Sequence, residues 1–191
     1  MKRVKYTPTG LPEELSLLEV DRVVSLIEDL RRQKAAGVEV EVVTHVAADA
    51  DAIVSAALVK IVLDEDGPGT ATVVWGSSDG AVGEEHPHRM GVDVKVGPRS
   101  IKGRESSAAE VIACAIQLIG WELDESVAEI VDEVTLIDTG RFREACLDMG
   151  LIIRSLKSAG WSDDEVLSHV ISQLSPHVSP PPPEALPEVA A

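Results

Sequence analysis

The pattern of hydrophobic and polar positions changes from helical to strand periodicity early in the chain. Apolar residues recur every three or four positions over residues 12–36, which predicts a helix that begins at a proline. Residues 38–44 alternate and then become continuously apolar, which predicts a strand, and residues 71–75 predict a second one. Between them, residues 52–63 are rich in Ala, Val, Ile and Leu and predict a helix. This strand–helix–strand order predicts an α/β fold with a small parallel sheet flanked by helices.

The second half of the chain is predicted to be mainly helical. A short strand is expected at residues 91–96 and a basic connector at residues 98–104. Ser107 and Ser162 each stand three residues before a glutamate, which is the pattern of a capping box that opens a helix. The other helices that the periodicity predicts cover residues 124–136 and 141–158.

We expect a single domain over residues 1–174, because the connections between these elements are short. It consists of the N-terminal helix, an α/β core at residues 38–97 and a helical part at residues 105–174. Residues 175–191 are rich in proline, with four in a row at residues 180–183, which is typical of a polyproline-like or disordered segment. The alternative for this tail is a segment that docks on a partner.

The composition indicates a globular chain without membrane segments. Apolar residues make up 45% of the 191 residues and aromatic residues only 3%, so the core must consist of Val, Ile, Leu and Ala. The apolar runs are far shorter than the roughly 20 residues of a membrane helix, and the N-terminus lacks the apolar stretch of a signal peptide. Cys114 and Cys146 fall in helical patterns and support neither a disulfide scaffold nor a zinc site. We therefore expect a cytoplasmic protein that does not associate with membranes.

The net charge of −16 limits the partners of the chain. With 33 acidic and 17 basic residues, most of the surface would repel duplex nucleic acid. A small phosphorylated substrate is still compatible with this charge if a local basic patch or metal ions hold it. The basic residues between positions 89 and 104 flank a single acid, Asp93. They form either a local anion site or a group that neutralises nearby carboxylates.

The segment after the first predicted strand carries the most informative chemistry. His45, Asp49 and Asp51 follow one another closely there, and ligands of open α/β sheets bind just past the carboxyl ends of strands. Imidazole and carboxylate groups are suitable ligands for Mn²⁺, Mg²⁺ or Zn²⁺. Asp49 and Asp51 are two positions apart and can hold different ions. The alternative is structural, since either aspartate could cap the following helix and His45 could bond a loop carbonyl.

Residues 44–57 resemble the first motif of the DHH phosphoesterase superfamily, in which H-x-x-x-D-x-D is followed by a small residue and a Ser-Ala pair. Residues 136–142 resemble the fourth motif of this family, an Asp-Thr pair that follows a helix and leads to a phenylalanine. Residues 104–112 resemble the Ser-Ser-Ala helix that follows the third motif in some branches. The resemblance extends over residues 38–145. It implies a DHH-like α/β core with two divalent metal ions and hydrolysis of phosphate esters.

The chain departs from this family in one motif, because it contains no Asp-His-His triplet. Alignment backward from residues 106–108 places Asp93 at the acid of the triplet and Val94 and Lys95 at its two histidines. The carboxylate that bridges the two metal ions in the family is then matched by Asp79, in the preceding loop, or by Asp93 itself.

The resemblance implies a role for each matching residue. His45 and Asp49 would hold one metal ion, Asp51 would hold the other, and Asp138 would complete the coordination. The expected metal is Mn²⁺ or Mg²⁺, as one or two ions. The candidate ligands of the substrate phosphate are Lys95, Lys102, Arg104 and His88. For His88 the alternative to this role is an exposed loop position without a ligand.

These features favour a divalent-metal-dependent phosphohydrolase that acts on a small phosphate ester, a nucleotide or a short oligonucleotide. The alternative is a degenerate DHH-like domain that serves as a binding or regulatory module. The triplet is missing, and the helical part after residue 142 is too short for the separate substrate-binding domain that is usual in the family. The substrate cleft is then open, completed by the second subunit of a homodimer, or absent. A further alternative is an interaction protein that docks through its Pro-rich tail.

Overall fold

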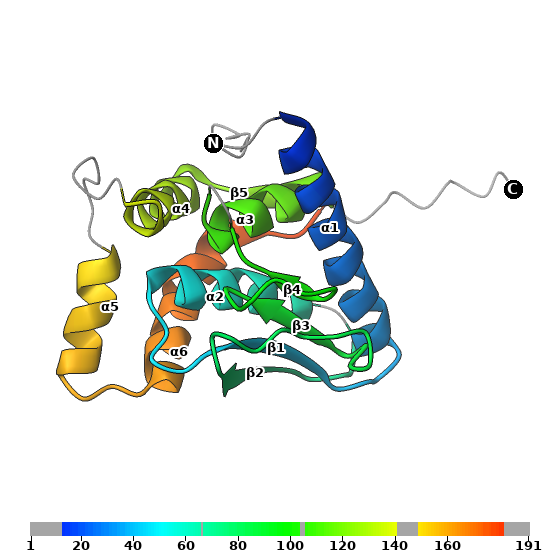
Figure 1. The fold of residues 1–191 in the computed structure, drawn as a ribbon, viewed down its shortest axis with the longest axis horizontal. Coiled ribbons are helices and arrows are strands. Elements are labelled where there is room, and N and C mark those ends of the chain that lie inside the picture. The colour runs from blue at the N-terminus through cyan, green and yellow to red at the C-terminus, as the bar shows by residue number, and fades with distance from the viewer. Residues whose placement is uncertain (1–12, 66, 104–105, 141–148, 182–191) are drawn as a thin grey trace, which may run out of the picture.

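A parallel sheet of four strands and the helices that pack on it form the framework of the chain (Figure 1). The computed structural model describes residues 13–65, 67–103, 106–140 and 149–181. The sheet has the order β2-β1-β3-β4 and consists of β1 (Val40–His45), β2 (Ala71–Gly76), β3 (Arg89–Val92) and β4 (Ser100–Ile101). The predicted α/β fold with a parallel sheet flanked by helices is therefore confirmed.

The helices follow the predicted segments closely. They are α1 (Glu13–Ala35), α2 (Ala50–Asp64), α3 (Ala108–Leu118), α4 (Glu125–Asp138), α5 (Met149–Ser158) and α6 (Asp163–Leu174). The first part of the predicted helix at residues 141–158 lies outside the described residues, and α5 covers its second part. No helix among those described combines the length and the apolar composition that crossing a bilayer requires.

Helix α2 lies at the centre of the core. Its residues are buried along almost its entire length, and it contacts β1 and β2 as well as α3, α4 and α6. In Figure 1 the sheet lies below α2, α3 and α4, and α1 runs along one side. One face of β1, formed by Val40, Val42 and Thr44, is fully buried, whereas Val43 and His45 on the opposite face are half-buried. The end of β1 therefore presents His45 on the less covered side of the sheet.

Side-chain caps fix the starts of the helices around the sheet. Asp49 caps α2 by accepting a hydrogen bond from the N–H of Ala52, and Ser107 caps α3 by accepting one from the N–H of Glu110. At α6 the predicted capping box is complete, because Ser162 and Glu165 bond each other's backbone N–H groups. Three local sequence signals thus position three helix N-termini.

The prediction for the strand at residues 91–96 was wrong in its bounds. β3 ends at Val92, and Asp93 turns the chain with a left-handed φ of 48°, so the apolar alternation continues past the real end of the strand. β4 lies inside the segment that was predicted to be a connector. A strand of two residues is too short to show periodicity, and β4 exists because Ser100 and Ile101 pair with Gly91 and Val92.

The boundary of the tail at residue 175 was also placed too early. Ser175–His177 form a 3-10 turn, η1, and β6 (Val178–Ser179) pairs antiparallel with β5 (Glu122–Leu123). The His177 ring bonds the Asp124 carboxylate, which also caps α4. These contacts order the start of the Pro-rich segment, whereas residues 182–191 lie outside the described part of the chain.

Candidate metal centre

The residues of the first motif lie where two neighbouring parallel strands end. His45 is the last residue of β1, and Asp93 follows directly after β3, which pairs with β1. From this point the chain leaves β1 toward β2 on one side, and it leaves β3 toward β4 on the other side. Such a divergence at the carboxyl ends of adjacent strands is the usual place for a ligand in an open α/β sheet.

His45, Asp49 and Asp93 form a group that could hold a metal ion. One ligand atom of each residue lies within 4.8 Å of the others. Asp49 reaches the group from the N-cap of α2, where its Oδ1 accepts a hydrogen bond of 3.1 Å from the N–H of Ala52. Nε2 of His45 lies 3.0 Å from Oδ2 of Asp93. The sequence allowed Asp49 to be a helix cap or a metal ligand, and in the structure it caps the helix and also belongs to the candidate centre.

The orientation of the His45 ring suits a metal ligand. Its Nδ1 lies 3.1 Å from the carbonyl oxygen of Val46, and a carbonyl can only accept, so Nδ1 carries the proton. In the neutral ring Nε2 then presents a lone pair to an oxygen of Asp93, which also has only lone pairs to offer. A cation shared by these two atoms, or protonation of the ring, relieves this contact. Histidine ligands are commonly oriented by such a bond from the other ring nitrogen.

Asp93 is buried between the side chains of Lys102 and His45. The residue is 3% exposed, and its Oδ1 accepts a hydrogen bond of 2.9 Å from the ammonium group of Lys102. Its other oxygen faces His45. The left-handed φ of 48° costs about 1 kcal/mol for a residue other than glycine, so this conformation is imposed by its surroundings.

Asp51 points to the start of α3 rather than into the group of His45, Asp49 and Asp93. The residue is 2% exposed, and its carboxylate accepts hydrogen bonds from the N–H of Ala108 at 2.9 Å and of Ala109 at 2.8 Å. The hydroxyl of Ser55 donates a third one, at 3.3 Å. A carboxylate is favoured at a helix N-terminus because the free N–H groups there carry partial positive charge. Asp51 thus ties α2 to α3.

Several carboxylates lie close enough to influence one another. Burial and, after it, the charges of Asp93 and Asp138 together raise the pKa of Asp51 to about 8, against the opposing effect of the N–H groups of Ala109 and Ala108. Burial of its carboxyl group also raises the pKa of Asp138, as do the charges of Asp93 and Asp49, while Lys102 opposes the shift. Asp138 ends α4, which approaches α3 through a hydrogen bond of 2.6 Å between Thr135 and Ser107.

The structure does not bring all predicted residues to this centre. Asp79 is exposed in the loop after β2 and is outside the group that could hold a metal ion, whereas Asp93 belongs to that group. His88 precedes β3 and therefore lies at the end of the strand opposite to Asp93. Lys95 is exposed on the turn after Asp93, where its N–H bonds the carbonyl of Ser78. Arg104 lies outside the described residues.

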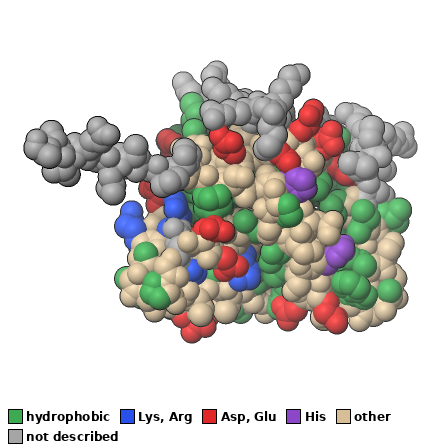
Figure 2. Space-filling model, turned by 180° about the vertical axis from the view of Figure 1, so that it is seen from behind, with side chains coloured by type: hydrophobic (Ala, Val, Ile, Leu, Met, Phe, Trp, Pro, Cys, Tyr) green, Lys and Arg blue, Asp and Glu red, His purple; other side chains and the backbone are tan. Residues whose placement is uncertain are grey.

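The described basic residues between positions 89 and 102 mainly neutralise carboxylates. Arg89 forms an ion pair with Glu41, and Arg99 forms one with Asp29 at 2.9 Å. Lys102 bonds Asp93, as described above. Of the two interpretations of this basic segment, the contacts favour neutralisation over an open anion site. On the face shown in Figure 2, acidic side chains are spread over the surface, whereas Lys and Arg gather toward the side of α1.

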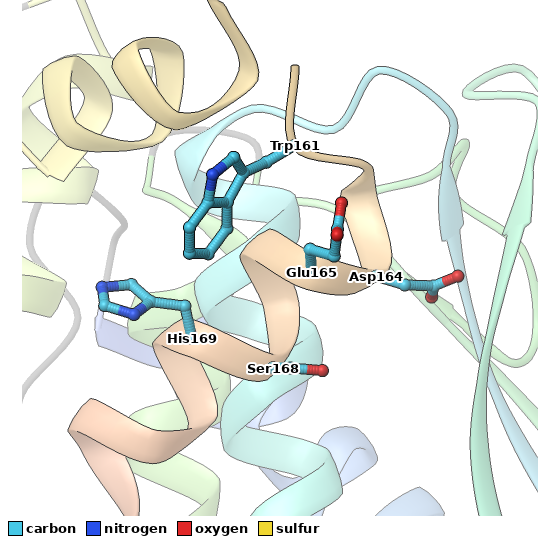
Figure 3. A pocket seen from close by; sticks show the side chains of 5 residues that line it. All are labelled: Trp161, Asp164, Glu165, Ser168 and His169. Carbon is cyan, nitrogen blue, oxygen red and sulfur yellow. The ribbon is translucent and has the colours of Figure 1, made fainter. Parts of the chain in front are cut away.

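A hollow of about 470 Å³ lies away from this centre, on the first turns of α6 (Figure 3). The rings of Trp161 and His169 line it in an edge-to-face arrangement, and their centroids lie 5.8 Å apart. The acidic residues that line it are engaged elsewhere, because Asp164 accepts a bond from Trp75 and Glu165 belongs to the capping box. This hollow brings together no group of metal ligands among the described residues, so the candidate site remains at the sheet edge.

Two residues beyond any sequence motif support the loop that carries the candidate ligands. Asp163, at the start of α6, accepts a hydrogen bond of 3.0 Å from the N–H of Ala47. Lys157 of α5 pairs with Asp163 and donates to the carbonyl of Ala48. The sequence gives no local signal for the bonds to Ala47 and Ala48, because they join positions more than 100 residues apart.

Comparisons with known proteins do not assign the chain to a family: no protein-family model, curated protein or solved structure matches it.

Proposed function

We propose that the chain is a divalent-metal-dependent phosphoesterase that acts on a small phosphate ester, a nucleotide or a short oligonucleotide. The observation that carries this proposal is the convergence of His45, Asp49 and Asp93 within 4.8 Å at the ends of two adjacent parallel strands. The resemblance of residues 44–57 to the first DHH motif supports the same reaction class. Mn²⁺ or Mg²⁺ fits the mixture of two carboxylates and one imidazole.

Each ligand of this centre is oriented by the chain itself. The bond to the Val46 carbonyl directs Nε2 of His45 toward the group, and the cap of α2 fixes one oxygen of Asp49. A bound divalent ion would supply Lewis acidity for a phosphate group and a source of hydroxide near neutral pH. Lys95 remains a candidate for the phosphate, because it is exposed two residues after Asp93.

A binding or regulatory module with the same fold is the second candidate function. It is favoured by the internal neutralisation of the centre, in which Lys102 bonds Asp93 and the α3 N–H groups bond Asp51. A centre that satisfies its own charges does not depend on a metal ion to stay folded. Metal binding and hydrolysis must therefore be measured separately.

The test is a calorimetric titration with Mn²⁺ of the full chain and of Asp49→Asn. Asparagine is as good an N-cap as aspartate, so this variant keeps the start of α2 and loses only the charged ligand. We expect metal affinity to fall at least tenfold. Asp64→Asn is the matched control, because Asp64 ends the same helix and pairs with Lys60, and its affinity should be unchanged.

Hydrolysis is then assayed on a generic phosphodiester and on short oligonucleotides, with and without Mn²⁺. Metal-dependent turnover that Asp49→Asn abolishes and Asp64→Asn retains would support the phosphoesterase. Metal binding without turnover of any of these substrates would favour the binding module. If the wild-type chain binds no Mn²⁺ at all, the metal-dependent function is wrong.

A further inference from the structure

Lys102 differs from Arg89 and Arg99 because its carboxylate partner belongs to the candidate centre. It follows β4, and its Nζ donates a hydrogen bond of 2.9 Å to Oδ1 of Asp93. Oδ2 of the same carboxylate lies 3.0 Å from Nε2 of His45. One carboxylate therefore links the Lys102 ammonium to the group that could hold a metal ion, and the ammonium lies directly beside that group.

The ammonium group of Lys102 retains donors for a ligand. A lysine ammonium has three N–H donors, and within the described residues Asp93 is the acceptor that it contacts. The side chain of Lys102 is 48% exposed, whereas that of Arg99 is only 12% exposed. A ligand that arrives from solvent can therefore reach this ammonium while its bond to Asp93 remains.

The backbone that carries Lys102 is fixed by contacts from two other elements. β4 pairs with β3, and this pairing brings Lys102 next to the Asp93 that follows β3. The guanidinium of Arg22 in α1 donates to the carbonyls of Gly97 and Ser100, at 3.0 and 2.9 Å. Lys102 thus extends from an anchored strand, and the fold itself places its charge at the centre.

The charges of these groups favour an anion as soon as a divalent ion is bound. Asp49 and Asp93 carry one negative charge each, which Lys102 and a divalent ion together exceed by one positive charge. Two cations that contact the same carboxylate repel each other. An anion with several oxygens relieves this repulsion by contacting both, and lysine is a common ligand of phosphate.

We propose that Lys102 binds the phosphate group of the substrate beside the divalent ion, so that its ammonium opposes the ion and favours the anion. This inference rests on the proposed metal-dependent function and names a residue that recognises its substrate. Lys95 is the other candidate for this role and is exposed on the turn after Asp93. Within the described residues, a hydrogen bond to the centre distinguishes the side chain of Lys102 from that of Lys95.

The test measures the ion and the anion separately by calorimetry. Mn²⁺ is titrated first, and phenylphosphonate is then titrated at saturating Mn²⁺, because its P–C bond is not hydrolysed as a phosphate ester is. Lys102→Gln removes the charge and keeps an N–H donor for Asp93, while Lys102→Arg keeps the charge. We expect Lys102→Gln to bind phenylphosphonate about tenfold more weakly, since it loses a charged hydrogen bond. It should bind Mn²⁺ about threefold more tightly, since it loses a repulsive charge.

The opposite signs of these two changes distinguish phosphate binding from a structural role. A lysine that only orients Asp93 would weaken both ligands when it is replaced. Lys102→Arg should stay close to wild type for both ligands. Lys60→Met is the matched control and should change neither affinity, because Lys60 pairs with Asp64 at the far end of α2. Lys95→Met tests the other candidate and should reduce the phenylphosphonate affinity less than Lys102→Gln does.

The outcomes separate this inference from the function on which it rests. If Lys102→Gln binds phenylphosphonate as tightly as wild type, or binds both ligands more weakly, the role of Lys102 is wrong and the metal-dependent function stands. A larger loss in Lys95→Met than in Lys102→Gln also overturns the assignment. If wild type binds no Mn²⁺, both proposals fall. Circular dichroism verifies the fold of each variant, and Lys102→Met replaces Lys102→Gln if the latter does not fold.

Discussion

Asp51 is a single carboxylate that joins the first turns of two helices while being almost completely buried. In the folded chain its pKa is raised to about 8, mainly by burial and then by the charges of Asp93 and Asp138, whereas the ordinary value is 3.8. Between these two values the folded state binds more protons than the unfolded state. The stabilisation that protonated Asp51 gives is therefore complete below pH 3.8 and is lost as the pH rises to about 8.

We expect the free energy of unfolding of the metal-free chain to fall as the pH is raised from 5 to 8, by at most about 1.4 kcal/mol per pH unit from this group. Asp51→Asn should flatten this dependence, because asparagine does not titrate. Urea unfolding in the presence of a chelator at several pH values measures it, with Asp64→Asn as the control. If the free energy of unfolding of Asp51→Asn falls equally steeply with pH, another titrating group is responsible for the pH dependence.

The limits of sequence reasoning are visible at the same residues. His45 and Asp49 were recognisable because they share one local motif, and Asp93 because the alignment backward from residues 106–108 places it at the acid of the missing triplet. The partner of Asp51 was not recognisable, since the N–H groups of Ala108 and Ala109 lie 57 and 58 positions away. Local spacing predicts which residues have metal-binding chemistry, but the packing of α3 on α2 decides which way a side chain turns.

At the scale of elements, the connection between α5 and α6 holds the loop of the candidate centre in place. Asp163 bonds the N–H of Ala47, whose φ of 55° is left-handed and therefore strained for a residue with a side chain. Lys157 bonds both Asp163 and the carbonyl of Ala48. The loop that ends at Asp49 is thus positioned by residues that would not touch the metal.

We expect Asp163→Asn to weaken Mn²⁺ binding about tenfold, as is typical when a residue that orients metal ligands is changed. The number of Mn²⁺ ions bound per chain should stay the same in this variant, because no metal ligand is removed. Calorimetry is the measurement, and Asp164→Asn is the control, since Asp164 is the next residue of the same helix turn and bonds Trp75 instead. Equal affinities in the two variants would contradict a positioning role for Asp163.

The elements with strong periodicity were predictable, and those made by pairing alone were not. α1, α2, β1 and β2 agree with their predicted ranges to within two residues. β4, β5 and β6 have two residues each, so only their partners define them. The start of the Pro-rich segment is ordered for the same reason, through pairing with β5 and through the bond between His177 and Asp124.

At the scale of the whole molecule, the centre lies where elements from both halves of the chain meet. β1 and α2 supply His45 and Asp49, the turn after β3 supplies Asp93, and the segment after β4 supplies Lys102. The start of α3 bonds Asp51 of α2, and α4 ends at Asp138, whose charge acts on Asp51. A ligand bound here would be lost completely on unfolding, because residues 45–138 of the unfolded chain do not hold these groups together.

Metal binding should therefore stabilise the entire fold. At a Mn²⁺ concentration of 100 times the dissociation constant, linkage adds about 2.7 kcal/mol to the free energy of unfolding, which for a chain of this size raises Tm by about 5–10 °C.

The net charge of −16 requires a control, since any divalent ion also screens repulsion between surface carboxylates. Asp49→Asn changes the net charge by only one unit and removes a ligand. A rise in Tm that is large in wild type and small in Asp49→Asn, measured at the same ionic strength, is the expected result. Equal rises in both proteins would assign the stabilisation to general screening rather than to the centre at His45, Asp49 and Asp93.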